Sequence, residues 1–144
     1  MSDNLFEMVI PSLNREWMQA CVDSFSLSVD TPGAILYVDN QHTNRGVAGA
    51  WNLGIDSMFA RDADWLVICS ESVRFGEYGA HDLIRAMKES SGDTMAIEAD
   101  GGLGWHLIAF RREVFEKVGY FDELFYPAYF EDNDFSYRYQ KAYE

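Results

Sequence analysis

Residues 34–69 read AILYVDNQHTNRGVAGAWNLGIDSMFARDADWLVIC, and the order of apolar and polar stretches in this segment decides the fold class. The continuous apolar run at Ala34–Val38 predicts a strand that is covered on both faces. After a polar loop at Asp39–Gly46, apolar residues spaced about one helical turn apart predict a helix at Val47–Phe59. A second apolar run at Trp65–Cys69 predicts another buried strand. This strand–helix–strand order indicates parallel strands joined by a right-handed crossover.

The same alternation of apolar strands and amphipathic helices continues on both sides of this segment. Strands are expected at Leu5–Ile10, Thr94–Glu98 and Trp105–Phe110, with Pro11 closing the first of them. Helices are expected at Asn14–Leu27, at Gly79–Ser90, at Glu113–Val118 and from Glu131 onward. We therefore expect a single α/β domain over residues 1–144, with a Rossmann-like, mostly parallel sheet flanked by helices.

Composition and charge exclude several classes of protein. The 144 residues are 48% hydrophobic, which is enough for a packed core, and they carry a net charge of −13, which repels nucleic acid. The longest apolar runs are too short to cross a bilayer, and the polar N-terminus is no secretory signal. Cys21 and Cys69 both lie in apolar contexts, which favours buried free thiols over a disulfide. A reducing, cytoplasmic location is expected.

Polar side chains follow three of the predicted strands, where open α/β sheets bind ligands. Asp39 is placed either to accept hydrogen bonds from a ribose diol or to form a turn. Asn44, Gly46 and the small residues after them begin a helix, either to admit a phosphate or to pack closely on the sheet. Asn52 points either into the cleft or to solvent.

Acidic residues supply the other candidate chemistry. Glu71, between Ser70 and Ser72, could bind Mg²⁺ or Mn²⁺ next to a diphosphate, although one carboxylate with two hydroxyls supplies few ligands. The run Glu131–Asp134 either complements a helix N-terminus or supplies a general base. Arg138 pairs either with these acids or with a phosphate. His106 lines the cleft or belongs to the core, and the aromatic residues of 120–130 are mostly core but can also stack on sugars or bases.

In chain order, four segments resemble the family 2 glycosyltransferases of the GT-A fold. They are VIPSLNREWMQACVDSF (9–25), ILYVDNQHTNRGVAGAWNLGI (35–55), DADWLVICSESV (62–73) and GWHLIAFRREVFEKVGYFDELFYPAYFEDNDFSYR (104–138). The second contains the pattern Asn-x-Gly-x-x-x-Ala-x-Asn-x-Gly-Ile, the third occupies the place of the DXD metal motif, and the fourth matches the acceptor-side pattern with its Glu-Asp pair. The resemblance covers nearly the whole chain.

The resemblance implies inverting transfer of a sugar from a UDP-, TDP- or GDP-sugar to a hydroxyl of a glycan, lipid-linked or protein acceptor. Asp132 is implied as the general base, with Glu131 beside it, and Mn²⁺ or Mg²⁺ as the cofactor held at Glu71 and Ser72. The nucleotide-binding residues implied are Pro11, Asn14, Asp39, Asn44, Gly46 and Asn52. The acceptor-side residues implied are Trp105, His106 and Arg138.

Two departures from the family pattern leave an alternative open. Ser70-Glu71-Ser72 stands where the family has its metal-binding aspartates, and the chain ends soon after Arg138, where the family usually continues with further helices. The chain is then a minimal enzyme, a fragment or part of an assembly, and exposed aromatic surface would favour a homo-oligomer. The alternative function is a non-catalytic nucleotide- or glycan-binding module with a degenerate metal motif.

Overall fold

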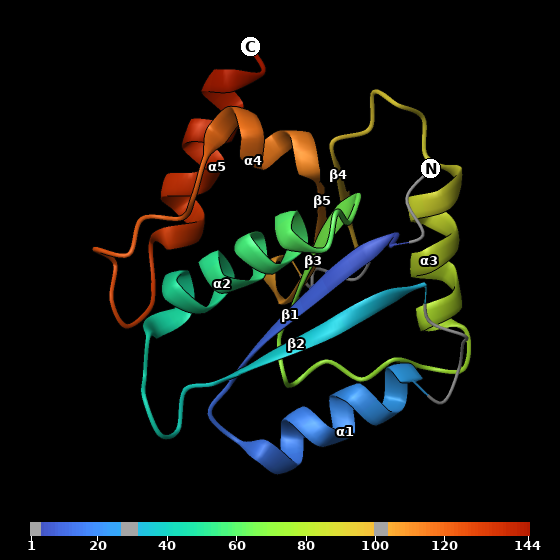
Figure 1. Cartoon of the computed structure of the whole chain (residues 1–144), viewed down its shortest axis with the longest axis vertical. Coiled ribbons are helices and arrows are strands. Elements are labelled where there is room, and N and C mark those ends of the chain that lie inside the picture. The colour runs from blue at the N-terminus through green and yellow to red at the C-terminus, as the bar shows by residue number, and fades with distance from the viewer. Residues whose placement is uncertain (1–3, 27–31, 100–103) are drawn as a thin grey trace.

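The computed structural model describes residues 4–26, 32–99 and 104–144 (Figure 1). Within these residues five strands form one mixed sheet in the order β2-β1-β3-β5-β4. The strands are β1 (Phe6–Ser12), β2 (Gly33–Asp39), β3 (Trp65–Cys69), β4 (Ala96–Glu98) and β5 (Leu107–Arg111). The helices are α1 (Arg15–Ser26), α2 (Gly46–Ala60), α3 (Gly79–Glu89), α4 (Arg112–Val118) and α5 (Glu131–Ala142), with a short 3₁₀ turn η1 (Gly104–His106).

The sheet is mixed, and its α/β architecture with flanking helices fits the expected Rossmann-like class. Strand β1 pairs in parallel with both β2 and β3, whereas β5 pairs antiparallel with both β3 and β4. Four strands therefore point one way, and β5 lies reversed between two of them. The reason is the short connection from Glu98 to Leu107, because a parallel return needs a crossover of about a dozen residues or more.

The predicted element boundaries are otherwise close to the observed ones, with two corrections. Pro11 does not close the first strand, because β1 stays paired with β2 as far as Ser12. Trp105 and His106 are not in a strand but in η1, immediately before β5. Leu27, the expected last residue of the first helix, lies outside the described residues. The described part of the chain holds no helix with the length and apolar character to span a membrane.

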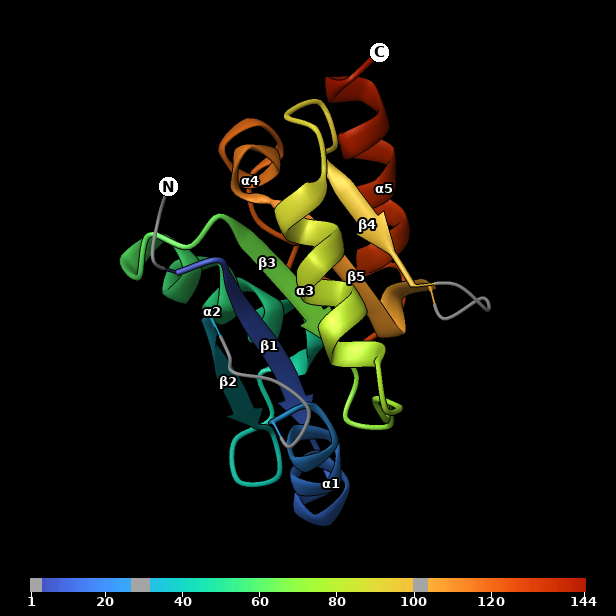
Figure 2. The same ribbon diagram turned by 90° about the vertical axis from the view of Figure 1, so that its right-hand side faces the viewer.

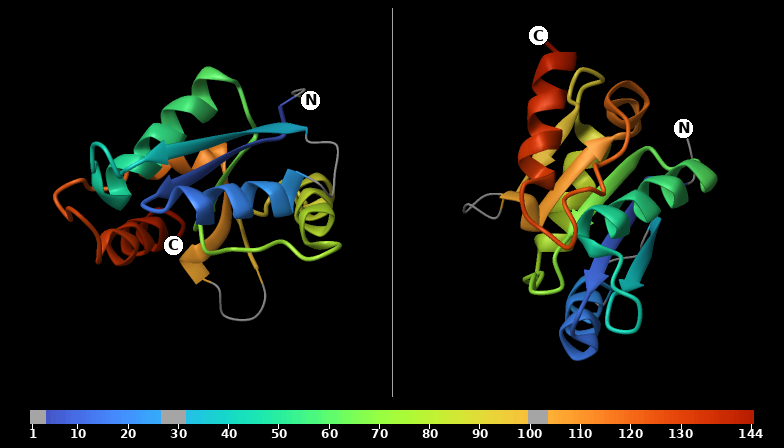
Figure 3. Two further views of the ribbon diagram at one scale, coloured as in Figure 1. Left: turned by 90° about the horizontal axis from the view of Figure 1, so that it is seen from below. Right: turned by 90° about the vertical axis from the view of Figure 1, so that its left-hand side faces the viewer.

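Helices cover both faces of the sheet, as Figures 2 and 3 show, with α1 and α3 on one face and α2, α4 and α5 on the other. Alternation along the central strands supplies both cores, because successive side chains point to opposite faces. On β3, Trp65 and Val67 face α1 and α3, while Leu66 and Ile68 face α2. The sheet is therefore a buried middle layer.

The two cysteines pack in the core on the α1 side. Both are fully buried free thiols, and their Sγ atoms lie 3.7 Å apart. Cys69 is the last residue of β3 and Cys21 is on α1, so this contact fixes α1 beneath the end of β3.

Aromatic rings fill the core on the other face and anchor the C-terminal part of the chain. Phe135 of α5 stacks on Phe121 with ring centroids 4.3 Å apart and meets Phe110 of β5 edge-on at 5.6 Å. Both Phe121 and Phe135 are almost fully buried. Aromatic pairs of this kind are worth about 0.5–1.5 kcal/mol beyond their buried area. The position of α5 is thus held by ring contacts with β5 and with the segment between α4 and α5.

The close contact of α2 with β1 depends on a glycine. A Cβ atom placed on Gly54 would lie only 2.6 Å from the Cβ of Val9, so a side chain at this position would push the helix off the strand.

We expect Gly54→Ala to destabilise the fold by about 1–3 kcal/mol, the usual cost of overpacking, despite the better helix propensity of alanine. Unfolding in urea measures the difference. Gly92→Ala is the matched control, because nothing lies within 4 Å of a Cβ at Gly92. Equal stabilities of the two variants would contradict this account of the packing.

Candidate functional site

A pocket of about 660 Å³ opens where β1, β2 and β3 end and β5 begins. Because β5 runs opposite to β3, the residues just before β5 arrive at the same end of the sheet as those just after β3. The start of α2, the loop at 127–129 and the start of α5 complete the walls. Eight residues singled out from the sequence line it: Pro11, Asn44, Gly46, Glu71, Trp105, His106, Glu131 and Asp132. Five others do not line it: Asn14, Asp39, Asn52, Ser72 and Arg138.

Glu71 joins the ends of β1 and β3. Its Oε1 accepts a hydrogen bond from the backbone N–H of Leu13 at 3.3 Å, and its Oε2 accepts one from that of Asn14 at 3.1 Å. The Asn14 side chain is used locally, since its Oδ1 accepts the N–H of Trp17 at 3.1 Å and caps α1. Glu71 and Asn14 therefore hold the backbone between β1 and α1 in place beside the end of β3.

The described residues do not fit the divalent metal expected at Glu71 and Ser72. Both carboxylate oxygens of Glu71 accept backbone N–H groups, and the Ser72 hydroxyl lies 2.9 Å from that of Ser70. Across residues 4–26, 32–99 and 104–144, no three His, Cys, Asp or Glu side chains are grouped so that they could hold a metal ion. Hard cations need several oxygen ligands, and one committed carboxylate with hydroxyls does not supply them.

Asp39 forms a turn at the end of β2. Its Oδ1 accepts the N–H of Gln41 at 2.9 Å, and its Oδ2 lies 2.8 Å from His42 Nδ1. The hydrogen bond with His42, followed by that from Gln41, lowers the pKa of the Asp39 carboxyl. Asp39 lines a small separate hollow with Arg15 rather than the main pocket.

Asn40, which lines the pocket beside the predicted Asp39, holds the start of α2. It is 5% exposed, its Oδ1 accepts the N–H of Arg45 at 3.2 Å, and its Nδ2 donates to the Gly46 carbonyl at 3.3 Å. Asn44 contributes to the same turn, because its Oδ1 accepts the Gly46 N–H at 2.8 Å. The sequence indicates a turn-forming pair at 39–40 but not which member faces the pocket.

Gly46 lets the 126–127 segment approach the start of α2, which Figure 1 shows side by side. Its φ is +76°, and a Cβ there would lie 2.9 Å from the Pro127 carbonyl oxygen. The next residue, Val47, donates its N–H to that carbonyl at 2.8 Å. This hydrogen bond attaches the 127–129 segment, which forms part of the pocket wall, to the start of α2.

Asn52 is buried and bonded to the 121–123 segment rather than turned to the pocket or to solvent. Its Nδ2 donates to the Phe121 carbonyl at 3.0 Å, and its Oδ1 accepts the Phe121 N–H at 2.9 Å. Glu123 Oε2 accepts a further hydrogen bond from Nδ2 at 3.0 Å. The Asn52 side chain thus pairs with both backbone polar groups of Phe121.

Asn52→Ala is expected to lower the free energy of unfolding by about 2–4 kcal/mol, since two buried main-chain groups each lose a partner at roughly 1–3 kcal/mol. Chemical denaturation measures this loss. Leu53→Ala, a change on the next residue of α2 that is 38% exposed, is expected to cost much less. A variant as stable as wild type that fails to bind nucleotide would instead support a ligand-binding role for Asn52.

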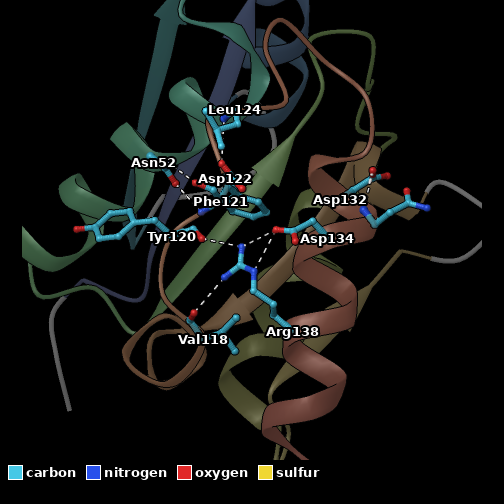
Figure 4. A network of polar contacts seen from close by, with 10 residues as sticks. Asn52, Val118, Tyr120, Phe121, Asp122, Leu124, Asp132, Asp134 and Arg138 are labelled. Carbon is cyan, nitrogen blue, oxygen red and sulfur yellow. Dashed lines mark hydrogen bonds and ion pairs between the residues drawn. The ribbon is translucent and has the colours of Figure 1, made fainter.

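Arg138 points from α5 toward the backbone of Val118 and Tyr120, as Figure 4 shows, and it does not line the pocket. It forms an ion pair with Asp134 at 3.0 Å and donates to the carbonyls of Val118 and Tyr120 at 3.1 and 2.8 Å. These contacts tie α5 to the end of α4. Of the two interpretations drawn from the sequence, the structure favours pairing with an acid.

Two adjacent carboxylates stand in the pocket wall at the start of α5. Glu131 is only 5% exposed, and within the described residues its Oε2 has no hydrogen-bond partner. Burial, together with the negative charge of Asp132, raises the pKa of the Glu131 carboxyl. Asp132 is half-buried, and its Oδ1 accepts the N–H of Asn133 at 2.9 Å. A buried carboxylate oxygen without a protein partner is uncommon, and in the pocket wall it is available to a hydrogen-bond donor.

Replacing Glu131 with Gln removes this buried charge, and we expect a gain of about 1–3 kcal/mol in stability at neutral pH. Because the folded-state pKa is raised, the native chain binds more protons than the unfolded chain in the window above about pH 4.3. Wild-type stability therefore falls as pH rises through that window, and the gain from Gln vanishes below it.

Thermal unfolding of Glu131→Gln and wild type across this pH range measures the effect. Glu77→Gln, a change of an exposed loop residue, is the control and should show no such dependence. A gain from Glu131→Gln that is independent of pH would contradict the burial argument.

Aromatic rings form the apolar walls of the pocket. Tyr129 belongs to the 120–130 segment whose rings the sequence allowed either in the core or at a ligand, whereas Trp51 was not singled out as a site residue. Trp51 of α2 stacks on Trp105 with ring centroids 5.4 Å apart and an interplanar angle of 24°. Tyr129 is 78% exposed and has a φ of +78°, in the left-handed region. Trp51 falls on the inner stripe of its helix, which is the usual pattern of a core residue, so periodicity could not identify it as pocket-lining.

No family model matches the chain, and no curated protein matches it. The fold and the pocket define an α/β protein with a ligand-sized site at the ends of its parallel strands.

Proposed function

We propose that the chain is a glycosyltransferase of the GT-A type that transfers a sugar from a nucleotide-diphosphate donor to a hydroxyl group. The observation that carries the proposal is the pair of carboxylates, Glu131 and Asp132, in the wall of the pocket at the ends of β1 and β3. The motif resemblance agrees with it, since the Glu-Asp pair of the resemblance is the pair that lines this wall. The pocket volume of about 660 Å³ lies in the range of small-molecule sites.

Asp132 acts as the general base in this proposal. Its carboxylate takes the proton of the acceptor hydroxyl while the hydroxyl oxygen attacks the anomeric carbon of the donor. The bond from that carbon to the diphosphate breaks with inversion, and the electron pair leaves with the nucleoside diphosphate. Glu131, buried beside it, accepts a hydrogen bond from a ligand group and orients the sugar.

The aromatic walls supply binding energy for flat and ring-shaped groups. Trp51, Trp105 and Tyr129 present rings to the pocket, and aromatic faces stack on sugar rings and bases. His106 also lines the pocket and can donate a hydrogen bond to a phosphate oxygen. No step of the proposal passes through a metal ion, because the described residues do not fit one.

Asp132→Asn should lower the rate of sugar transfer by a factor of about 10² or more, because the general base is lost. Its affinity for nucleotide should stay within a few-fold of wild type. The rate is measured as nucleoside diphosphate released from UDP-, GDP- and TDP-sugars, and binding by thermal shift with UDP, GDP and TDP, each with and without Mn²⁺. Asp134→Asn is the control, because Asp134 pairs with Arg138 and does not line the pocket. A wild-type rate of transfer by Asp132→Asn would contradict the assignment of Asp132 as the general base.

A second candidate is a binding module without transfer activity. It is favoured by Glu71, whose carboxylate accepts two backbone N–H groups where the family has its metal-binding motif. This candidate would be favoured if a nucleotide raises the thermal stability of the protein but no nucleoside diphosphate is released from any of these donors. Product formation would exclude it.

A further inference from the structure

A second cavity of about 330 Å³ lies on α5 next to the main pocket. Trp105 and Asp132 line both cavities, so the two meet at the proposed base. The remaining lining residues of the second cavity are Asn133, Ser136, Tyr137 and Gln140. We call this second cavity the α5 groove.

The lining residues from α5 recur at intervals of one helical turn, at 132–133, 136–137 and 140, and therefore share one face of the helix. Asn133, Ser136 and Gln140 are exposed, and in the described part of the chain their side chains make no hydrogen bond. The Tyr137 ring remains 61% exposed, although Lys141 Nζ lies 5.8 Å from its centroid. The groove thus offers amide and hydroxyl groups beside two aromatic rings, those of Trp105 and Tyr137.

We propose that the α5 groove binds the acceptor and that this acceptor is an uncharged carbohydrate. This inference rests on the proposed function. Four of the six lining residues carry uncharged polar groups, which match sugar hydroxyls as donors and acceptors. The charged member is Asp132, which disfavours an anionic ligand, and an alkyl chain would leave the polar groups unpaired.

The shared wall gives the groove a defined role in transfer. A sugar in the α5 groove reaches Asp132 from one side, while the donor occupies the main pocket on the other. Glu131, whose buried Oε2 lacks a partner among the described residues, faces the main pocket but not the groove. The two carboxylates then serve different substrates: Asp132 takes the acceptor proton, and Glu131 holds the donor sugar.

The test measures sugar binding apart from turnover. Amide chemical shifts of the whole chain are followed by NMR while methyl glycosides of glucose, galactose, mannose and N-acetylglucosamine are added. We expect at least one of them to move the amides of Asn133, Ser136 and Gln140. Tyr137→Ala should weaken that glycoside by about tenfold through loss of ring contact. Tyr78→Ala is the matched control, since Tyr78 is 66% exposed and lies outside the α5 groove.

The outcomes separate this inference from the proposed function. Nucleotide binding and transfer to water or another acceptor, with no glycoside moving the α5 amides, would overturn the groove and leave the transferase proposal standing. Glycoside binding at α5 without transfer from any donor would support the groove as a sugar site, and it would overturn the transferase proposal and the acceptor role with it. Equal weakening by Tyr137→Ala and Tyr78→Ala would also overturn the groove.

Discussion

The hydrogen bonds between the Asn52 side chain and the backbone of Phe121 hold the two halves of the site together. One half is the α/β unit of β1, β2, β3 and α2, and the other is the segment that leads into α5. Phe121 then stacks on Phe135, so α5 is oriented from the same point, and Asp132 is carried with it. Hydrogen bonds are directional, so the Asn52 contacts help to set the position of both carboxylates, together with the ring contact of Phe135 with Phe110 and the hydrogen bonds of Arg138.

The order of helices and strands could be predicted from the sequence, but the place of β5 in the sheet could not. Apolar runs such as Trp65–Cys69 and the stripe on Val47–Phe59 are local patterns, and they indicate local structure. The short connection after β4 accounts for the reversal of β5, but its position beside β3 depends on a contact between distant segments. For the same reason, Glu131 and Asp132 could be proposed from the sequence as a pair in a site, whereas the partners of Asn52, 69 residues away, could not.

Glu71 illustrates how one residue type at one position supports two kinds of chemistry. Carboxylate oxygens accept backbone N–H groups as readily as they bind cations, and the ends of β1 and β3 present two N–H groups within reach. The acid therefore closes the gap between the neighbouring strands β1 and β3. The sequence shows an acid after an apolar strand, and only the geometry of Leu13 and Asn14 shows what it contacts.

The buried, unpartnered oxygen of Glu131 has a consequence for anyone who alters this chain. Selection of variants by heat resistance alone would reward the loss of that charge, and such a screen would remove a group from the pocket wall while reporting improvement. Under the proposed function, the sequence that is most resistant to unfolding and the sequence that binds the donor best differ at this position. Libraries built on this scaffold should therefore be scored for binding as well as for stability.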